Sequence, residues 1–259
     1  MFPFYEEFNT KSDYFAVYSS ENIDFPLHIH AEIEALYVAQ GEITVFLNGE
    51  EYFLSAGDLA FVQGNSIHGY ESREVKFIMT IFSSGYIPSA MQIMKKKKFA
   101  LPVIFKDTLP TDVPYILNKL LTCESSDIFL IKGLLYQFIG EIIKVNPLVE
   151  DEAGRQDDLI TRSIKELSEH YKEKISLEDM AAHLYASPCY LSRLFKRTLK
   201  CGINEYANRL RIEDAKNMLK QTNETILSIA MNCGFESIRT FNRVFKGFEG
   251  VTPKEYRGA

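Results

Sequence analysis

The sequence lacks the features of several specialised protein classes. No apolar run reaches the roughly 18 residues that span a bilayer, and residues 1–7 do not have the basic-then-apolar order of an export signal. The four cysteines are scattered without a C-x-x-C pair, so neither a disulfide framework nor a zinc finger is expected. These absences predict a cytoplasmic protein that has reduced thiols and no membrane as a partner.

Charge is distributed unevenly along the chain. The 259 residues are 46% hydrophobic and 25% charged, with a formal net charge of −6, a balance typical of folded globular proteins. From Arg155 onward there are 18 Lys and Arg against 14 Asp and Glu, whereas the part before it has 11 against 21. The C-terminal part is therefore net positive and the N-terminal part net negative, which predicts domains with different partners.

Residues up to about Ser84 have the pattern of an antiparallel β-domain. Alternating apolar stretches flank Asn48-Gly49, and this dipeptide favours a tight hairpin because both turn residues must accept positive φ. Gly57-Asp58 then precedes a further strand at residues 59–62. Several short strands with regular turns predict a barrel or jelly roll.

From Pro114 the apolar period becomes helical. The residues on this period are Ile116, Leu117, Leu120, Leu121, Ile131, Leu134, Leu135, Phe138 and Ile142. They are more numerous than a single exposed helix needs, and two interpretations stay open: they pack on the barrel, or they form a dimer interface. The acidic stretch at residues 146–158 is expected to be an interdomain linker.

The C-terminal part repeats itself at an offset of fifty residues. Residues 187–196 match residues 237–246, and each copy follows a short stretch with apolar residues at helical spacing. Ser187 before Pro188 is typical of a helix start, and Ser176 with Asp179 resembles a capping box. Each copy therefore predicts a helix–turn–helix unit.

The second helix of each copy has polar or small residues at its outward positions. Arginine can form paired hydrogen bonds with guanine, and asparagine with adenine. The expected base-reading residues are Cys189, Ser192, Arg193, Ile238, Arg239, Asn242 and Arg243. Lys196, Lys200 and Lys246 are expected to contact phosphates. A helix over residues 204–220, about 25 Å long, would separate the two reading helices by close to one DNA turn, about 34 Å.

Over residues 157–257 the chain resembles the AraC/XylS family of bacterial transcription regulators. The matching elements are Tyr190-Leu191-Ser192-Arg193-Leu194-Phe195-Lys196, Arg211 with Ala215, Ile229-Ala230, Gly234-Phe235, Phe245-Lys246 and Gly250-x-Thr252-Pro253-x-x-Tyr256-Arg257. The resemblance implies base-facing roles for the same seven residues, double-stranded DNA as a partner and RNA polymerase as a further one. Tyr185-Ala186 stands where the family usually has a glycine, so a distorted first turn is expected.

Two motifs in the N-terminal part resemble those of cupin barrels, the usual sensor domain of AraC-like proteins. They are His28-x-His30-x3-Glu34-x6-Gly41 and Gly57-x5-Gln63-Gly64-Asn65-x2-His68, with Gln63 in place of the usual proline. His28, His30 and Glu34 share parity, so on one strand they face the same side. His68 would complete a set of three imidazoles and one carboxylate suited to a divalent transition metal.

Three interpretations of this cluster stay open: a metal site, contacts to an organic effector without metal, and a polar core. The expected fold is α+β, with a cupin-like β-barrel and its helices in residues 1–145, the linker, and an all-α double helix–turn–helix domain in residues 159–259. The expected function is a homodimeric, non-enzymatic regulator whose operator binding responds to a small-molecule effector in the barrel, a carbohydrate by analogy. The alternatives are a metal-dependent cupin enzyme or a metal sensor fused to the DNA-binding domain, and a protein-interaction module without DNA binding.

Overall fold

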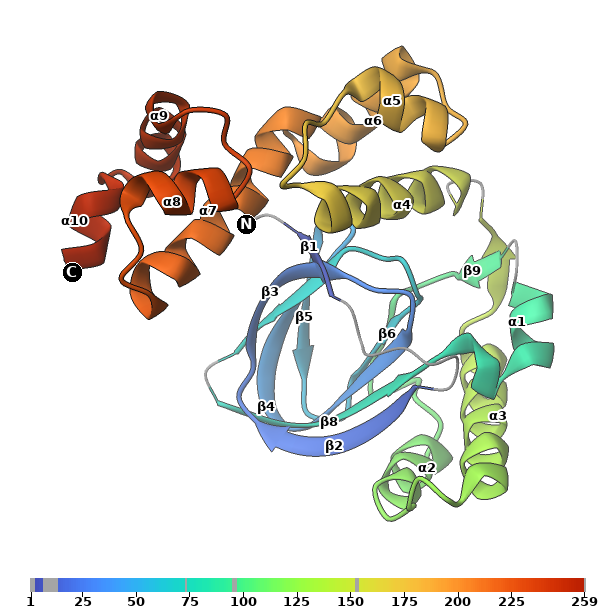
Figure 1. The fold of residues 1–259 in the computed structure, drawn as a ribbon. Coiled ribbons are helices and arrows are strands. Elements are labelled where there is room, and N and C mark those ends of the chain that lie inside the picture. Colours follow the sequence, from blue (N-terminus) through green and yellow to red (C-terminus); the bar gives the residue numbers. More distant parts are fainter. Residues whose placement is uncertain (1–2, 7–13, 73, 95–96, 152–153, 259) are drawn as a thin grey trace. The chain divides into compact units, whose positions relative to one another are not determined.

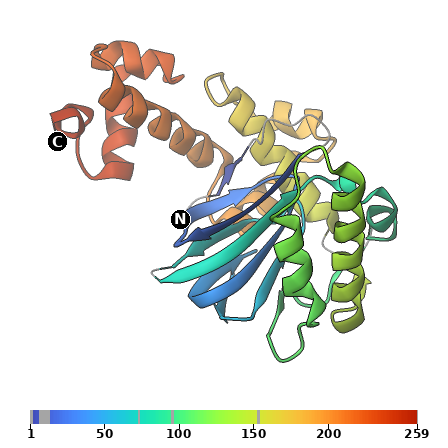
Figure 2. The same ribbon diagram turned by 90° about the horizontal axis from the view of Figure 1, so that it is seen from below.

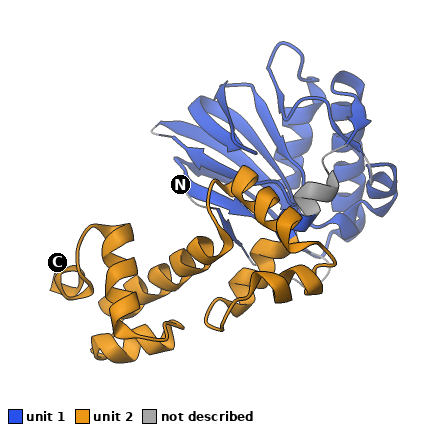
Figure 3. Ribbon diagram, turned by 90° about the horizontal axis from the view of Figure 1, so that it is seen from above, with its two compact units in different colours: residues 1–161 blue, residues 162–259 orange. Residues whose placement is uncertain are grey.

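The computed structural model describes residues 3–6, 14–72, 74–94, 97–151 and 154–258. It divides into two compact units, residues 1–161 and residues 162–259 (Figure 3). The first is rich in strands and the second is helical (Figure 1). The expected α+β class is therefore confirmed, and each unit is described by itself.

A long strand, β4 (Ile33–Leu47), organises the N-terminal unit. Its first part pairs with β6 (Leu59–Val62) and β8 (Val75–Phe82), and its second part pairs with β5 (Glu50–Ser55) and β7 (His68–Glu71). The register shifts between Val38 and Gln40, next to Gly41 with φ +79°. A Cβ at Gly41 would lie 1.8 Å from the carbonyl oxygen of Glu74, so glycine is required where the strand passes from one group of partners to the other.

Shorter strands extend these two groups. β1 (Phe4–Tyr5) pairs in parallel with β3 (Asp24–Ile29), which pairs with β7, while β2 (Phe15–Glu21) pairs with β8 and β10 (Val103–Ile104) with β6. Among the described strands the order from β1 to β10 does not close on itself, so the jelly roll is open rather than a continuous barrel. The predicted hairpin is confirmed, with Asn48 and Gly49 both at positive φ between β4 and β5.

Helices cover one side of the strands. α1 (Pro88–Met94), α2 (Asp112–Leu120) and α3 (Ile128–Val145) follow the short 3-10 turn η1 (Ser84–Tyr86), and Figure 2 shows α2 and α3 (green to yellow-green) beside the strands. The apolar residues predicted on their helical period pack in one core with Ile33, Phe61 and Phe82 of the strands. Of the two interpretations left open for these residues, core packing is therefore confirmed.

Residues 146–158, the expected interdomain linker, contain regular structure in part. β11 (Leu148–Glu150) pairs with β9 (Lys97–Phe99), and α4 (Gly154–His170) begins before the predicted end of the linker. The buried Asn146 side chain accepts a hydrogen bond from the backbone N–H of Leu101 at 3.0 Å and donates one to its carbonyl at 2.6 Å. Local composition indicates a loop there, but pairing with a distant strand overrides it.

The C-terminal unit contains two short helix pairs joined by a long helix. α5 (Leu177–His183) and α6 (Pro188–Leu199) form the first pair, and α8 (Ile226–Asn232) and α9 (Ile238–Glu249) form the second. α7 (Ile203–Gln221) joins them and α10 (Pro253–Gly258) follows. No helix in the described part of the chain is long and apolar enough to cross a membrane.

Candidate DNA-binding surface and metal centre

Side-chain caps start both candidate reading helices, at Ser187 as predicted and at Ser237, which matches it in the repeat. The hydroxyl of Ser187 accepts a hydrogen bond from the N–H of Tyr190 at 3.3 Å, and Ser237 accepts one from Thr240 at 3.2 Å. Pro188 occupies the first helical position of α6, where its missing N–H leaves no bond unmade. The repeat seen in the sequence is therefore a repeat of local structure.

Each reading helix is held by a buried apolar face. Leu191, Leu194 and Phe195 are buried in α6, and Phe195 contacts the ring of Tyr206 in α7 with centroids 5.6 Å apart. The corresponding residues of α9 are also buried: Phe241, Val244 and Phe245. Because these faces are occupied, the opposite face of each helix is left for a partner.

The predicted base-reading residues lie on these opposite faces. Six of the seven are exposed, and Ser192 is half-buried. Lys196, Lys200 and Lys246 are exposed as well. Their contact with bases and phosphates stays a prediction, as does the separation of one DNA turn between α6 and α9.

The turn of the first unit is not distorted. Tyr185 has φ +53° and Gly234 has φ +87°, so both occupy the left-handed region. In each turn the next N–H donates to a carbonyl five residues earlier: Ala186 to Ala181 at 2.8 Å, and Phe235 to Ala230 at 3.0 Å. The expectation of a distorted turn is wrong because tyrosine adopts the glycine-like conformation here.

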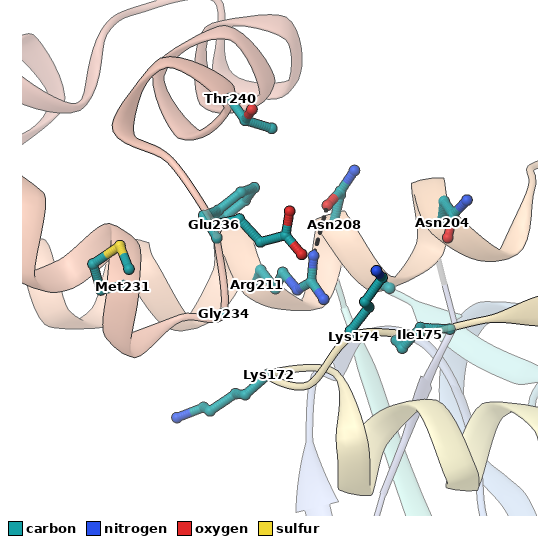
Figure 4. A pocket seen from close by; sticks show the side chains of 12 residues that line it. Lys172, Lys174, Ile175, Asn204, Asn208, Arg211, Met231, Gly234, Glu236 and Thr240 are labelled. Carbon is teal, nitrogen blue, oxygen red and sulfur yellow. Dashed lines mark hydrogen bonds between the residues drawn. The ribbon is translucent and has the colours of Figure 1, made fainter.

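A cavity of about 420 Å³ lies between the loop after α4, α7 and the turn before α9 (Figure 4). Within it, the Arg211 guanidinium donates to the carbonyl oxygens of Tyr171 at 2.6 Å and Glu173 at 2.7 Å, and to Oδ1 of Asn208 at 3.3 Å. Its carbon lies 5.7 Å from the ring centre of Phe235. Arg211 thus ties the loop to α7 and to the second helix–turn–helix unit, a role that its place in a sequence motif does not reveal.

The four residues of the predicted N-terminal cluster come together. One ligand atom from each of His28, His30, Glu34 and His68 lies within 4.8 Å of the others, and all four side chains are buried. The parity argument for one strand is wrong, because β3 ends at Ile29 and β4 begins only at Ile33. The cluster forms instead because pairing of β3 with β7 places His28 opposite His68, with their ring centroids 3.9 Å apart.

Backbone contacts define which nitrogens of two histidines carry a proton. Nδ1 of His28 lies 3.0 Å from the carbonyl of Pro26, and Nδ1 of His68 lies 2.9 Å from that of Ser66. A nitrogen can contact a carbonyl in this way only as a donor, so in the neutral rings Nε2 holds the lone pair. The buried Nε2 of His68 has no hydrogen-bond partner and lies 3.5 Å from Oε2 of Glu34. A cation between these two atoms, either a proton on Nε2 or a metal ion, would satisfy both of them.

Glu34 is at the centre of the cluster. Its Oε2 lies 3.1 Å from Nε2 of His30, and its Oε1 accepts a short hydrogen bond from the hydroxyl of Tyr70. Burial alone would raise the pKa of Glu34, but its contacts with His30 and His68 outweigh this and hold the pKa well below its usual range. Burial, together with the neighbouring His68, lowers the pKa of His28 to about 3. At neutral pH Glu34 is charged and His28 neutral, the forms that bind metal.

Three further residues at this centre lie outside the predicted cluster. Besides Tyr70, Glu6 has an oxygen 3.5 Å from Nε2 of His28, and Glu32 has one 3.6 Å from Nδ1 of His30. Glu6 follows β1, which reaches the site only through its parallel pairing with β3. No local pattern signals that contact, whereas Glu32 lies inside the first motif and could have been included.

The donor set fits a divalent transition metal. Imidazole nitrogens and a carboxylate oxygen are the usual ligands of such ions. Two ligands on opposite sides of an ion at about 2.1 Å each are about 4.2 Å apart, close to the span of this cluster. A bound ion would also satisfy the Nε2 of His68, which has no hydrogen-bond partner. One ion can therefore be held, with small side-chain adjustments, by His28, His30, Glu34 and His68.

Two family models match the chain, a helix-turn-helix domain over residues 180–259 and a cupin domain over residues 16–83. The regulatory protein PocR of Salmonella typhimurium is 35% identical over 123 residues, which cover 45% of this chain and 40% of PocR. An uncharacterised HTH-type transcriptional regulator of Bacillus subtilis, YisR, is 26% identical over 244 residues, which cover 88% of this chain and 84% of YisR.

The fold has a counterpart among solved structures. ToxT of Vibrio cholerae, in a structure with an unsaturated fatty acid bound, superposes over 97% of both chains with a TM-score of 0.52 and 15% identity, which shows a shared fold. The order of the two domains, the repeated capped helices and the buried cupin cluster agree with these matches. The chain therefore contains a cupin domain followed by a helix-turn-helix domain, and in this it is similar to AraC-family transcription regulators that carry an N-terminal cupin domain.

Proposed function

We propose that this protein binds specific DNA sequences through α6 and α9, and that an effector bound at the cupin centre modulates its operator occupancy. The observation that carries the proposal is the buried cluster of three histidines and Glu34 in the unit that lacks the reading helices. Such a cluster is costly to bury without a ligand. An effector that binds one conformation better than another shifts the population toward it and so changes DNA affinity.

A divalent transition-metal ion is the effector that the cluster favours. The four donor atoms lie within 4.8 Å of one another, which leaves room for one ion and not for an organic molecule among them. ToxT binds an unsaturated fatty acid in one structure, but here the space between the strand groups holds buried side chains such as Leu36, Phe77 and Met79. A carbohydrate or another organic effector would have to bind at the edge of this centre.

The protein residues define what such an ion would change. His28 and His68 are oriented by their backbone hydrogen bonds, and Tyr70 holds Glu34. Bound to these donors, an ion would act as a Lewis acid and would relieve the contact between His68 and Glu34. Because the donors come from β3, β4 and β7 and the segment between β3 and β4, ligation would hold these strands in one arrangement.

Metal content and DNA affinity test this proposal together. We would measure transition metals in freshly purified protein by elemental analysis, for the native chain and for His28→Ala and His68→Ala. DNA selected from a random duplex library by the full chain would then be titrated with each protein, with and without a chelator. His183→Ala is the matched control, because His183 is exposed and lies outside the cluster.

The expected result is one equivalent of metal in the native chain and the control, and loss of metal together with a changed DNA affinity in the two cluster variants. A stoichiometric metal whose removal leaves DNA affinity unchanged would refute modulation through this centre. Native protein without metal would refute the ion and direct the search to organic effectors. Substrate turnover by the metal-loaded protein would support the enzyme alternative.

A further inference from the structure

The cavity between the loop after α4, α7 and the turn before α9 has an excess of positive charge (Figure 4). Lys172, Lys174 and Arg211 line it, and Glu236 is the one acidic residue in its described lining. Lys172 pairs with Asp214 at 2.8 Å. Lys174 is exposed and has no hydrogen-bond or ion-pair partner in the described part of the chain. At about 420 Å³, the cavity has the size of a small-ligand site.

Arg211 keeps hydrogen-bonding capacity inside this cavity. A guanidinium has five N–H groups. The carbonyls of Tyr171 and Glu173 and the side chain of Asn208 accept from three of them, so one N–H on each Nη is left. Arg211 is half-buried and has no ion pair with any residue in the described ranges. Burial lowers its pKa, and the charge of Glu236 offsets this only in part. An anion in the cavity would compensate the buried charge.

Neutral hydrogen-bond donors from two helices line the same cavity. They are Asn204 and Asn208 of α7 and Thr240 of α9. The hydroxyl of Thr240 accepts a hydrogen bond from Ser237 at 3.0 Å, which leaves its own proton free to donate. Asn204 and Thr240 lie in the first turns of their helices, where the helix dipole favours negative charge. Donors from three segments suit a tetrahedral phosphate, whose oxygens point in several directions.

We propose that this cavity is a phosphate-binding site whose positive charge comes from Lys174 and Arg211. Two sources offer the same chemical group: a backbone phosphate of the duplex that α9 binds, and a small phosphorylated molecule. Only the first source rests on the proposed DNA binding, and neither involves the cupin centre. A bound phosphate would contact the loop after α4, α7 and α9 together, and would so favour one position of the reading helix relative to α7.

Glu236 opposes an anion in this cavity and therefore provides a sharp test. Its side chain is exposed, and its charge acts on Arg211 without an ion pair between them in the described ranges. Glu236→Gln removes this negative charge and keeps the size of the side chain, so phosphate affinity is expected to rise. A gain in affinity cannot result from a damaged fold.

The first measurement is calorimetric titration of the full chain with inorganic phosphate, without DNA, at fixed ionic strength and with a chelator present. Lys174→Gln is expected to weaken binding by about tenfold, and Lys174→Arg, which keeps the charge, to stay within about threefold of the native value. Glu236→Gln is expected to tighten binding by at least about twofold. Lys220→Gln is the matched control, because Lys220 is exposed at the other end of α7, and it should change nothing.

The second measurement identifies the source of the phosphate. Affinity for the selected duplex and for a scrambled one would be measured over a range of salt concentrations. Loss of one phosphate contact lowers the slope of log K against log salt by about 0.9 and weakens both duplexes alike. This change in Lys174→Gln, with stronger binding by Glu236→Gln, would show a DNA phosphate. A native slope, with inorganic phosphate bound as expected, would show a free phosphorylated molecule.

Three outcomes would overturn the proposal. The first is a chain that binds no inorganic phosphate and keeps its native salt slope in Lys174→Gln. The second is phosphate binding that Lys174→Gln leaves unchanged, because the anion then lies elsewhere. The third is weaker binding of phosphate by Glu236→Gln. A chain that binds no DNA would refute the proposed function and the DNA source, while the titration with inorganic phosphate would still decide whether the site exists.

Discussion

The two helix–turn–helix units have the same turn conformation, but different residues form it. Tyr185 and Gly234 both have left-handed backbone conformations, with equivalent hydrogen bonds on either side. The Tyr185 side chain is 96% exposed, whereas a Cβ at Gly234 would lie 2.4 Å from the carbonyl oxygen of Lys172. The first turn therefore tolerates a side chain at the cost of backbone strain, and the second cannot accept one. The difference arises from what surrounds the turn, not from the turn itself.

The surfaces that the two units present also differ. α6 offers Arg193 with the small side chains of Cys189 and Ser192, while α9 offers two arginines and Asn242. The second unit thus has more side chains that can form paired hydrogen bonds with bases. We expect α9 to supply more of the sequence discrimination, and α6 to supply less.

The largest effect is expected at the second turn. Gly234→Ala would add both a left-handed alanine, at about 1–2 kcal/mol, and a clash with the backbone of Lys172. We expect the free energy of unfolding to fall by about 3 kcal/mol or more, measured by urea denaturation of the full chain. Gly247→Ala is the control, because that helical glycine has nothing within 4 Å and the change should stabilise. A loss below about 1 kcal/mol at position 234 would contradict the steric argument.

Substitutions in the reading helices are expected to have the next largest effect. Arg243→Ala and Arg193→Ala should each weaken binding to the selected DNA by about 1–3 kcal/mol, with an unchanged fold. Arg243→Lys keeps the charge but not the forked geometry, so it should lose discrimination while nonspecific affinity remains. Fluorescence anisotropy with specific and scrambled duplexes measures both quantities. If both alanine variants bind the selected DNA normally, these helices have been wrongly assigned.

The smallest effect is expected at the first turn. Tyr185→Gly removes the strain of a left-handed tyrosine, about 1–2 kcal/mol, but glycine gives the unfolded chain about 0.5–1 kcal/mol of additional entropy. We expect a net gain of roughly 0.5 kcal/mol, visible as a small rise in Tm, and unchanged DNA affinity. A marked loss of stability would show that the ring of Tyr185 contributes contacts that its exposure does not suggest.

Much of the local structure could be predicted from short stretches of sequence. Ser187, Ser237 and Thr252 cap helices as their neighbours indicate, and Asn48-Gly49 forms the expected hairpin turn. These features depend on residues within about four positions of one another, so the sequence order contains them directly. The strand β11 within the expected linker could not be predicted in this way, because it is defined by pairing with β9, about fifty residues away.

The cupin centre could be predicted only in part. The histidines and Glu34 form motifs, but Tyr70 and Glu6 reach the site through strand pairing and belong to no motif. The contacts of Arg211 with carbonyls 38 and 40 residues earlier in the chain are of the same kind. Which nitrogen of His68 is left without a partner also depends on the backbone around it.

By itself, the sequence determined the two domain types, the repeated helix–turn–helix units and the residues on the outward faces of those units. It could do so because helix caps, turns and amphipathic spacing depend on a few neighbouring residues. Only the tertiary structure decided that the apolar residues of α3 divide into a buried face and an exposed one. It also decided that Gly234 is indispensable where Tyr185 is not, and that Glu34 is held between histidines and a tyrosine. Each of these depends on which distant segments come into contact, and that is fixed by burial and packing of the whole unit rather than by local preference.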